Sequence, residues 1–189
     1  MPALVIRHVE ASDLPQFQVV RLKDGKTTPP VSIASPARTP VKDLPNSNLS
    51  AELRWYLEEF LDYPFPPVID RAEHVQEALR GWGEQAFTAL FGAGPGRDFY
   101  HDAYNTGLEQ LDLRIASDYP GVLAWPWEAL ADPQQAGTLA HHCRIERQLD
   151  RGHDLLPLPA GLPRDGVSIF DTHSINARAY EVVKHTVCN

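Results

Sequence analysis

The sequence predicts an α/β fold, and three patterns lead to that prediction. The segments "LVIRHVE" and "FQVVRL" near the start are rich in β-branched residues, which favour strands. Two segments, 48–64 and 70–91, repeat apolar residues at the spacing of amphipathic helices. Leu111, Leu113 and Ile115 alternate with Asp112, Arg114 and Ala116, as in a half-buried strand. We therefore expect a mixed sheet with two amphipathic helices.

Residues 1–26 are expected to form a small N-terminal β-unit. "KDGK" at 23–26 is a turn signal that could return the chain towards "VSIAS". Prolines at 29, 30, 36, 40 and 45 then interrupt every periodic pattern, because proline removes a backbone donor and restricts the residue before it. We interpret residues 27–47 as a proline-rich connector.

The first helix is expected to begin at an N-cap of Asn48 or Ser50 and to end at Pro64. In the second helix, Asp70 and Glu73 resemble a capping box. The apolar faces expected for the two helices are Leu49, Leu53, Leu57, Phe60 and Leu61 in the first, and Val75, Leu79, Trp82, Ala86 and Leu90 in the second.

"GAGPG" at 92–96 is expected to end the second helix as a loop. It lacks the Lys and Ser/Thr of a P-loop and the third glycine spacing of a dinucleotide loop, so the pattern disfavours phosphate binding. Gly81 and Gly83 weaken the middle of the helix by about 1 kcal/mol each relative to alanine.

The segment "LAWPWEALADP" at 123–133 places two tryptophans around a proline. We expect "VLAW" to be a returning strand and Pro126 to open a short helix that Pro133 ends. Trp125 and Trp127 would then pack this strand-to-helix corner against the core, and Glu128 would lie in the first helical turn. An aromatic platform for a ligand is the alternative.

The segment at 138–149, "TLAHHCRIERQL", alternates as a strand does. Leu139, His141, Cys143, Ile145 and Leu149 would share one face. A linker rich in Leu and Pro follows, and we then expect a short strand at 166–170 and a helix at 174–186. An exposed edge strand and an apolar helix in this tail would favour self-association or a partner.

No residue is assigned a catalytic, cofactor-binding or metal-binding role, and no cofactor is expected. His141 and Cys143 could both reach a zinc ion, but a structural site needs four ligands. Cys143 on an apolar strand face is expected to be a buried, inert thiol. His185 and Cys188 lie three residues apart at a terminus, where little would orient them.

The composition of the 189-residue chain disfavours several classes of partner. The net charge of −8, with scattered Lys and Arg, disfavours nucleic acid. The chain has no apolar run of roughly 18 residues and no signal-peptide pattern, so we expect no membrane partner and a cytoplasmic location. Two cysteines disfavour a disulfide framework.

The order of these segments resembles the amino-terminal part of a CHAT domain, a caspase-like domain often found beside tetratricopeptide repeats. The resemblance runs through "LRWYLEEFLDYP", a long helix, "LEQLDLRI", "LAWPWEALADP" and "LAHHCRIERQL", and covers roughly 17–149. It implies a partial caspase-like fold. Residues 48–160 would be the amino-terminal part of a CHAT-like domain, and 161–189 the start of an incomplete caspase-like core.

Active members of the family are cysteine peptidases with a His-x-x-Gly-His-Gly motif and an Ala-Cys-x-Ser motif. Neither occurs here: His101 precedes "DAYN", His173 precedes "SINAR", Cys143 lies in "HHCRI" and Cys188 is penultimate. The resemblance therefore carries no catalysis onto this chain, and we expect no peptidase activity from it alone.

Two hypotheses for function follow from the sequence. In the first, a non-catalytic CHAT-like segment scaffolds or regulates a caspase-like peptidase core, with the remainder of that domain or a tetratricopeptide-repeat region as its partner. In the second, the chain is a free-standing protein–protein interaction module whose acidic helices or tryptophan corner bind another protein.

Overall fold

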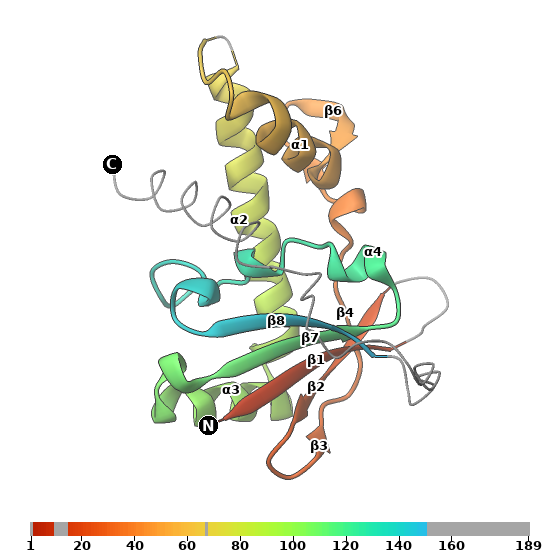
Figure 1. Ribbon diagram of the computed structural model, residues 1–189, viewed down its shortest axis with the longest axis vertical. Helices are drawn as coiled ribbons and strands as arrows, with labels where there is room; N and C mark the ends of the chain where they lie inside the picture. The colour runs from red at the N-terminus through yellow and green to blue at the C-terminus, as the bar shows by residue number, and fades with distance from the viewer. Residues whose placement is uncertain (1, 10–14, 67, 151–189) are drawn as a thin grey trace, which may run out of the picture. The chain divides into compact units, whose positions relative to one another are not determined.

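The fold is a mixed α/β structure, seen in a computed structural model that describes residues 2–9, 15–66 and 68–150 (Figure 1). The main-sheet strands are β1 (Ala3–Val9), β2 (Gln16–Arg21), β3 (Lys26–Thr27), β4 (Val31–Ser32), β7 (Asp112–Ser117) and β8 (Arg144–Leu149). Their order is β3-β2-β1-β7-β8, with β4 also pairing with β2. The β1–β7 and β7–β8 pairs are parallel, and the pairs of β2 are antiparallel. The predicted α/β class and mixed sheet are confirmed.

The N-terminal strands belong to the main sheet. β1 lies between β2 and β7 in the strand order. The turn predicted at 23–26 is present: Gly25 adopts a φ of 68° and donates its N–H to the carbonyl oxygen of Arg21 at 2.9 Å. After this turn β3 and β4 both return alongside β2.

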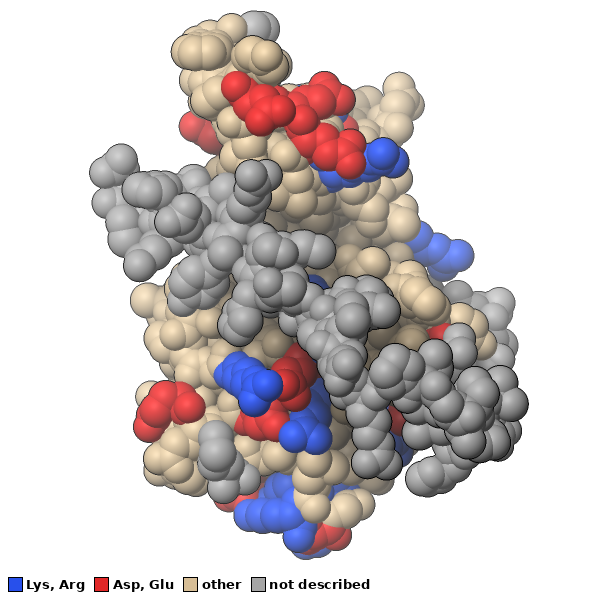
Figure 2. Space-filling model, in the orientation of Figure 1, with Lys and Arg blue, Asp and Glu red and all other residues tan. Residues whose placement is uncertain are grey.

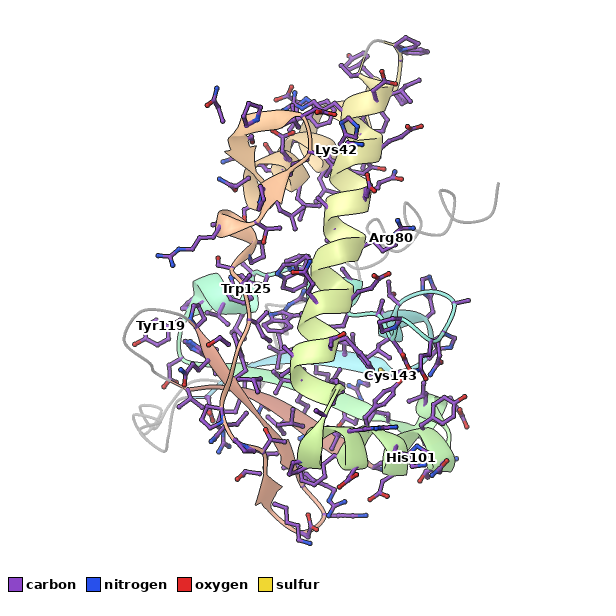
Figure 3. All side chains as sticks on the ribbon, turned by 180° about the vertical axis from the view of Figure 1, so that it is seen from behind. Lys42, Arg80, His101, Tyr119, Trp125 and Cys143 are labelled. Carbon is purple, nitrogen blue, oxygen red and sulfur yellow. The ribbon has the colours of Figure 1, made fainter. Side chains whose placement is uncertain are left out.

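The sheet has one apolar and one largely polar face. On the apolar face Ile6, Val19 and Leu113 are fully buried, and this face is covered by α2 (Ile69–Phe91) and α3 (Gly94–Thr106) (Figures 1 and 3). The opposite face carries a small buried group of Val5, Val20 and Ala116. Acidic and basic side chains lie next to each other on that face (Figure 2).

The first predicted helix is α1 (Leu49–Trp55), which continues as a π-helical turn at Tyr56–Phe60. The N-cap prediction is confirmed, because Asn48 Oδ1 accepts a hydrogen bond from the Ala51 N–H at 3.1 Å. The predicted apolar face is only partly right. Leu49 is fully buried but Leu57 is exposed, since the π turn shifts the helical phase.

Residues 27–47, interpreted as a connector, contain short ordered elements. These are β3, β4, a 3-10 turn at Pro36–Arg38, and a small hairpin of β5 (Pro40–Val41) and β6 (Leu44–Asn48). β5 also packs against α2.

Helix α2 buries the predicted face, including Val75, Trp82 and Leu90. The capping box predicted from Asp70 is wrong, because the helix already begins at Ile69 and Asp70 lies within its first turn. Helix α3 was missed, since its Gly-Pro-Gly start is typical of a loop. It begins within "GAGPG", at Gly94, and packs Phe99, Tyr100 and Ala103 into the core.

Two further segments differ from expectation. "VLAW" is not a returning strand: α4 (Pro120–Leu123) is a single helical turn begun by Pro120. After Pro126 only a 3-10 turn forms, at Trp127–Ala129. The strand expected from residue 138 begins at Arg144, because a 3-10 turn at Leu139–His141 precedes it. The strand and helix predicted within 166–186 lie outside the described residues.

Candidate functional site

The tryptophan corner is a core element. Trp127 is fully buried and its indole Nε1 donates to the carbonyl oxygen of Val122 at 2.8 Å. Trp125 stacks on Trp127 with ring centroids 5.6 Å apart, and lies beside α2 (Figure 3). Phe17 and Trp82 contact both tryptophans. The predicted structural role is confirmed. The faces of the two indole rings contact each other and neighbouring aromatic rings, so little ring surface is free to bind a ligand.

Glu128 links this corner to β8. Its Oε2 accepts a hydrogen bond from Arg147 Nη2 at 2.5 Å, and the same Nη2 donates to the carbonyl oxygen of Trp125 at 3.3 Å. The carboxylate at the start of the 3-10 turn therefore holds a side chain of β8. This contact connects β8 to the corner.

A histidine and a serine meet at the carboxyl ends of the parallel strands, where open α/β sheets commonly bind ligands. His8 Nδ1 of β1 lies 3.1 Å from Ser117 Oγ of β7. A serine beside a histidine can act as nucleophile and base. Ser117 is fully buried, however, and its Oγ also accepts the Tyr119 N–H at 3.0 Å. The Ser117 hydroxyl therefore closes the turn to Tyr119, and its burial leaves no room for a substrate carbonyl to approach it.

Cys143 lies just before β8 rather than on a strand face, and it is half-buried. Its N–H donates to the carbonyl oxygen of Leu139 at 2.8 Å. Burial, with a smaller contribution from the charge of Asp112, raises the pKa of the Cys143 thiol to about 11. The thiol is therefore protonated at neutral pH, which is the inert state expected from the sequence.

The other predicted site residues are not brought together. His141 Nδ1 lies 3.1 Å from Thr138 Oγ1, in the 3-10 turn before Cys143. His101 lies exposed on α3 (Figure 3). Within 2–9, 15–66 and 68–150, no group of three His, Cys, Asp or Glu residues could hold a metal ion. His173, His185 and Cys188 lie outside the described residues.

The "GAGPG" segment joins α2 to α3. The backbone of Gly96 lies so close to the carbonyl oxygen of Leu90 that a Cβ atom would collide with it. This glycine is therefore explained by helix packing.

A groove of about 270 Å³ lies between β4 and α2. Trp82 and Ile33 form part of its wall, and none of its lining side chains is ionisable. The groove therefore offers shape and apolar contact but no acid or base.

The outer edge of β8 was missed by sequence reasoning. Within the described residues β8 pairs only with β7. The Arg144 N–H donates to the carbonyl oxygen of Leu111, and the Asp150 N–H to that of Ser117. Backbone direction alternates along a strand, so the even-numbered residues face β7. Ile145, Arg147 and Leu149 therefore direct their N–H and C=O groups away from β7; these three residues are called the outer edge below.

Comparison of the chain with known protein families, with curated proteins and with solved structures finds no match. No helix among the described residues is long and apolar enough to cross a membrane.

Proposed function

We propose that this chain is a non-catalytic module that accepts a strand from a protein partner at the outer edge of β8. In this proposal it corresponds to the amino-terminal part of a CHAT-like domain, and the strand comes from a caspase-like core. The observation that carries the proposal is a parallel strand, β8, with an exposed surface and an outer edge that no described strand covers.

Parallel strands are normally buried on both faces, because helices or further strands cover them. β7 follows this rule, with Leu113 and Ile115 fully buried on one face and Ala116 fully buried on the other. β8 does not: Leu149 is 52% exposed, and no residue of the strand is fully buried. Among the described residues the core thus ends at its last parallel strand, as it would if another element normally lay beside it.

The charged side chains of β8 form ion pairs with each other and with neighbouring elements. Arg144 pairs with Glu146, Glu146 lies 3.6 Å from Arg114, and Arg147 binds Glu128. Unlike these side chains, the backbone groups of the outer edge have no partner strand among the described residues. Strand addition, in which backbone hydrogen bonds supply the affinity, fits this arrangement better than docking through charge.

Self-association of the full chain tests this proposal, because two copies of β8 can pair about a two-fold axis when no other strand is present. Leu149→Pro removes one outward N–H while the β7–β8 ladder stays intact, and Leu149→Ala is the matched control that keeps the N–H. We expect concentration-dependent association in sedimentation velocity at tens of micromolar for the native chain and the alanine variant, and a monomer for the proline variant. A native chain that stays monomeric throughout would overturn the proposal.

The alternative, a free-standing interaction module, is favoured by exposed apolar side chains at the start of α2 and in the segment before it, such as Phe65 and Ile69.

A further inference from the structure

We propose that the hairpin between α1 and α2 binds a basic amphipathic segment of another protein. The surface consists of four exposed apolar side chains, called the aromatic tip: Leu57, Tyr63, Phe65 and Ile69. It lies at the end of α2 far from the main sheet (Figure 1). This site is separate from the β8 edge and does not depend on the function proposed above.

The aromatic tip concentrates apolar surface in one short segment. Tyr63 is 74% exposed, Phe65 68%, Leu57 53% and Ile69 38%. These four residues are half of the large apolar side chains that stand exposed in the described part of the chain. Single exposed apolar residues are ordinary, but several within one short segment make that segment a candidate interaction site.

The turn that carries these side chains is held by its own backbone. The Phe65 N–H donates to the carbonyl oxygen of Tyr63 at 2.9 Å, and the Val68 N–H to that of Phe65 at 3.3 Å. Pro64 and Pro66 restrict the same stretch further. These restraints lower the backbone entropy that binding would cost, which favours affinity.

The base of the hairpin is clamped as well. The guanidinium carbon of Arg71 lies 3.7 Å from the centre of the Trp55 ring, and the same guanidinium makes two hydrogen bonds to the buried Glu52 carboxylate. The clamp joins α1 to α2 immediately below the aromatic tip. The tip therefore extends from a point where the two helices are held together by Arg71.

The charge around the tip selects the kind of partner. Residues 55–70 contain Glu58, Glu59, Asp62 and Asp70, all exposed, and no Lys or Arg. Arg54, just before this segment, is paired with Glu58 at 2.9 Å. Acidic side chains gather over this end of the molecule (Figure 2). An apolar surface with an acidic rim complements a segment that is apolar on one side and basic on the other.

The same charge disfavours an anionic lipid surface. Aromatic side chains at a hairpin tip could insert into a membrane interface, but peripheral helices that bind anionic membranes carry Lys and Arg on their polar face. Four carboxylates would be repelled by such lipids. The observations therefore favour a basic protein segment.

Fluorescence anisotropy with the full chain at low salt provides the test. The probe is a labelled peptide of roughly 18 residues, made of leucine and lysine with the leucines on one helical face. Its control is an isomer of the same composition whose leucines do not share a face. We expect the amphipathic peptide to bind more tightly than its isomer, and its affinity to fall by about ten-fold or more in the double variant Tyr63→Ser, Phe65→Ser.

Three further variants locate the effect. Leu22→Ser changes an apolar side chain that is 46% exposed elsewhere, so binding should be unchanged. The double variant Glu58→Gln, Glu59→Gln should weaken binding several-fold and reduce its dependence on salt. Leu149→Pro should bind the peptide normally, which separates this site from the β8 edge. Circular dichroism confirms that each variant is folded.

Equal affinity of the two peptides would overturn the proposal, and so would unchanged affinity in the Tyr63, Phe65 variant. A second arm uses vesicles of phosphatidylserine and phosphatidylcholine. Co-sedimentation with these vesicles that is lost in the Tyr63, Phe65 variant would assign the tip to membranes and would also overturn the proposal.

Discussion

Glu52 of α1 and Arg71 of α2 form an ion pair whose carboxylate is almost completely buried. Arg71 Nε donates to Glu52 Oε2 at 2.8 Å, and Arg71 Nη2 donates to Oε1 at 3.1 Å. The Glu52 side chain is 4% exposed. These hydrogen bonds are the largest influence on the carboxyl group and lower its pKa below the ordinary glutamate value. The helical pattern alone does not reveal why a glutamate lies at a buried position.

Arg71→Ala should destabilise the fold by about 1 to 3 kcal/mol, because it leaves a buried carboxylate without its donor. Urea denaturation at pH 7 measures the change. The double variant Glu52→Leu, Arg71→Met removes both charges. Its free energy of unfolding should therefore be closer to that of the native chain than to that of Arg71→Ala. A double variant as unstable as Arg71→Ala would show that the ion pair is not the cause.

The same pair predicts a dependence on pH. Because the pKa of Glu52 is lower in the folded than in the unfolded chain, its contribution to stability is present above the unfolded pKa and is lost as the pH falls through the folded pKa. The difference in unfolding free energy between the native chain and Glu52→Gln should therefore shrink on acidification below about pH 4.5. A difference that stays constant from pH 7 to pH 3 would contradict this assignment.

Gly81 and Gly83 should respond oppositely to alanine although both lie in the middle of α2. A Cβ atom on Gly83 would collide with the carbonyl oxygen of Ala129, whereas nothing lies within 4 Å of a Cβ on Gly81. Gly81→Ala should raise the unfolding free energy by about 1 kcal/mol, and Gly83→Ala should lower it by about 1 to 3 kcal/mol. Thermal unfolding of the two variants checks both signs; stabilisation by both would mean that α2 does not pack against the 127–129 turn.

Trp127→Ala should lower the unfolding free energy by about 3 to 5 kcal/mol, because the ring is fully buried and its indole N–H is paired with Val122. Denaturation with the fluorescence of the remaining tryptophans measures this loss. An unchanged denaturation midpoint combined with the loss of a binding activity would show that Trp127 belongs to a binding surface and not to the core.

Cys143 should react slowly with a thiol reagent. Its pKa of about 11, against an ordinary 9.0, leaves about 100-fold less thiolate at neutral pH. The variant Cys188→Ala isolates the Cys143 signal, and the rate should keep rising with pH beyond pH 9. A rate that reaches a plateau near pH 8 would contradict the raised pKa.

Long periodic segments were predicted well. Trp82, Ala86 and Leu90 in α2, and Leu113 and Ile115 in β7, repeat one period over enough residues for the buried face to be visible in the sequence. α3 was missed because Gly94, Pro95 and Gly96 have the composition of a loop, although Gly and Pro also suit the start of a helix after a tight link.

The candidate sites depend on features that a linear pattern does not contain. The outer edge of β8 follows from its register with β7, which pairs Leu113 with Ile145 across more than thirty residues of sequence. The exposure of Leu57 follows from the π turn, which breaks the helical period used to predict its burial. The acidic content of 55–70 is visible in the sequence, but its position around exposed aromatic residues is not.

Residue-resolved amide hydrogen exchange along β8 tests the central claim most directly. At a concentration low enough for the chain to be a monomer, the outer-edge amides of Ile145, Arg147 and Leu149 should exchange quickly, while those of Glu146 and Gln148, which face β7, should exchange slowly. At concentrations where the native chain associates, exchange of its outer-edge amides should slow. In Leu149→Pro the amides of Ile145 and Arg147 should still exchange quickly at the same concentration. If the monomer instead protects both sets equally, β8 already has a strand on its outer side, and the proposed docking edge does not exist.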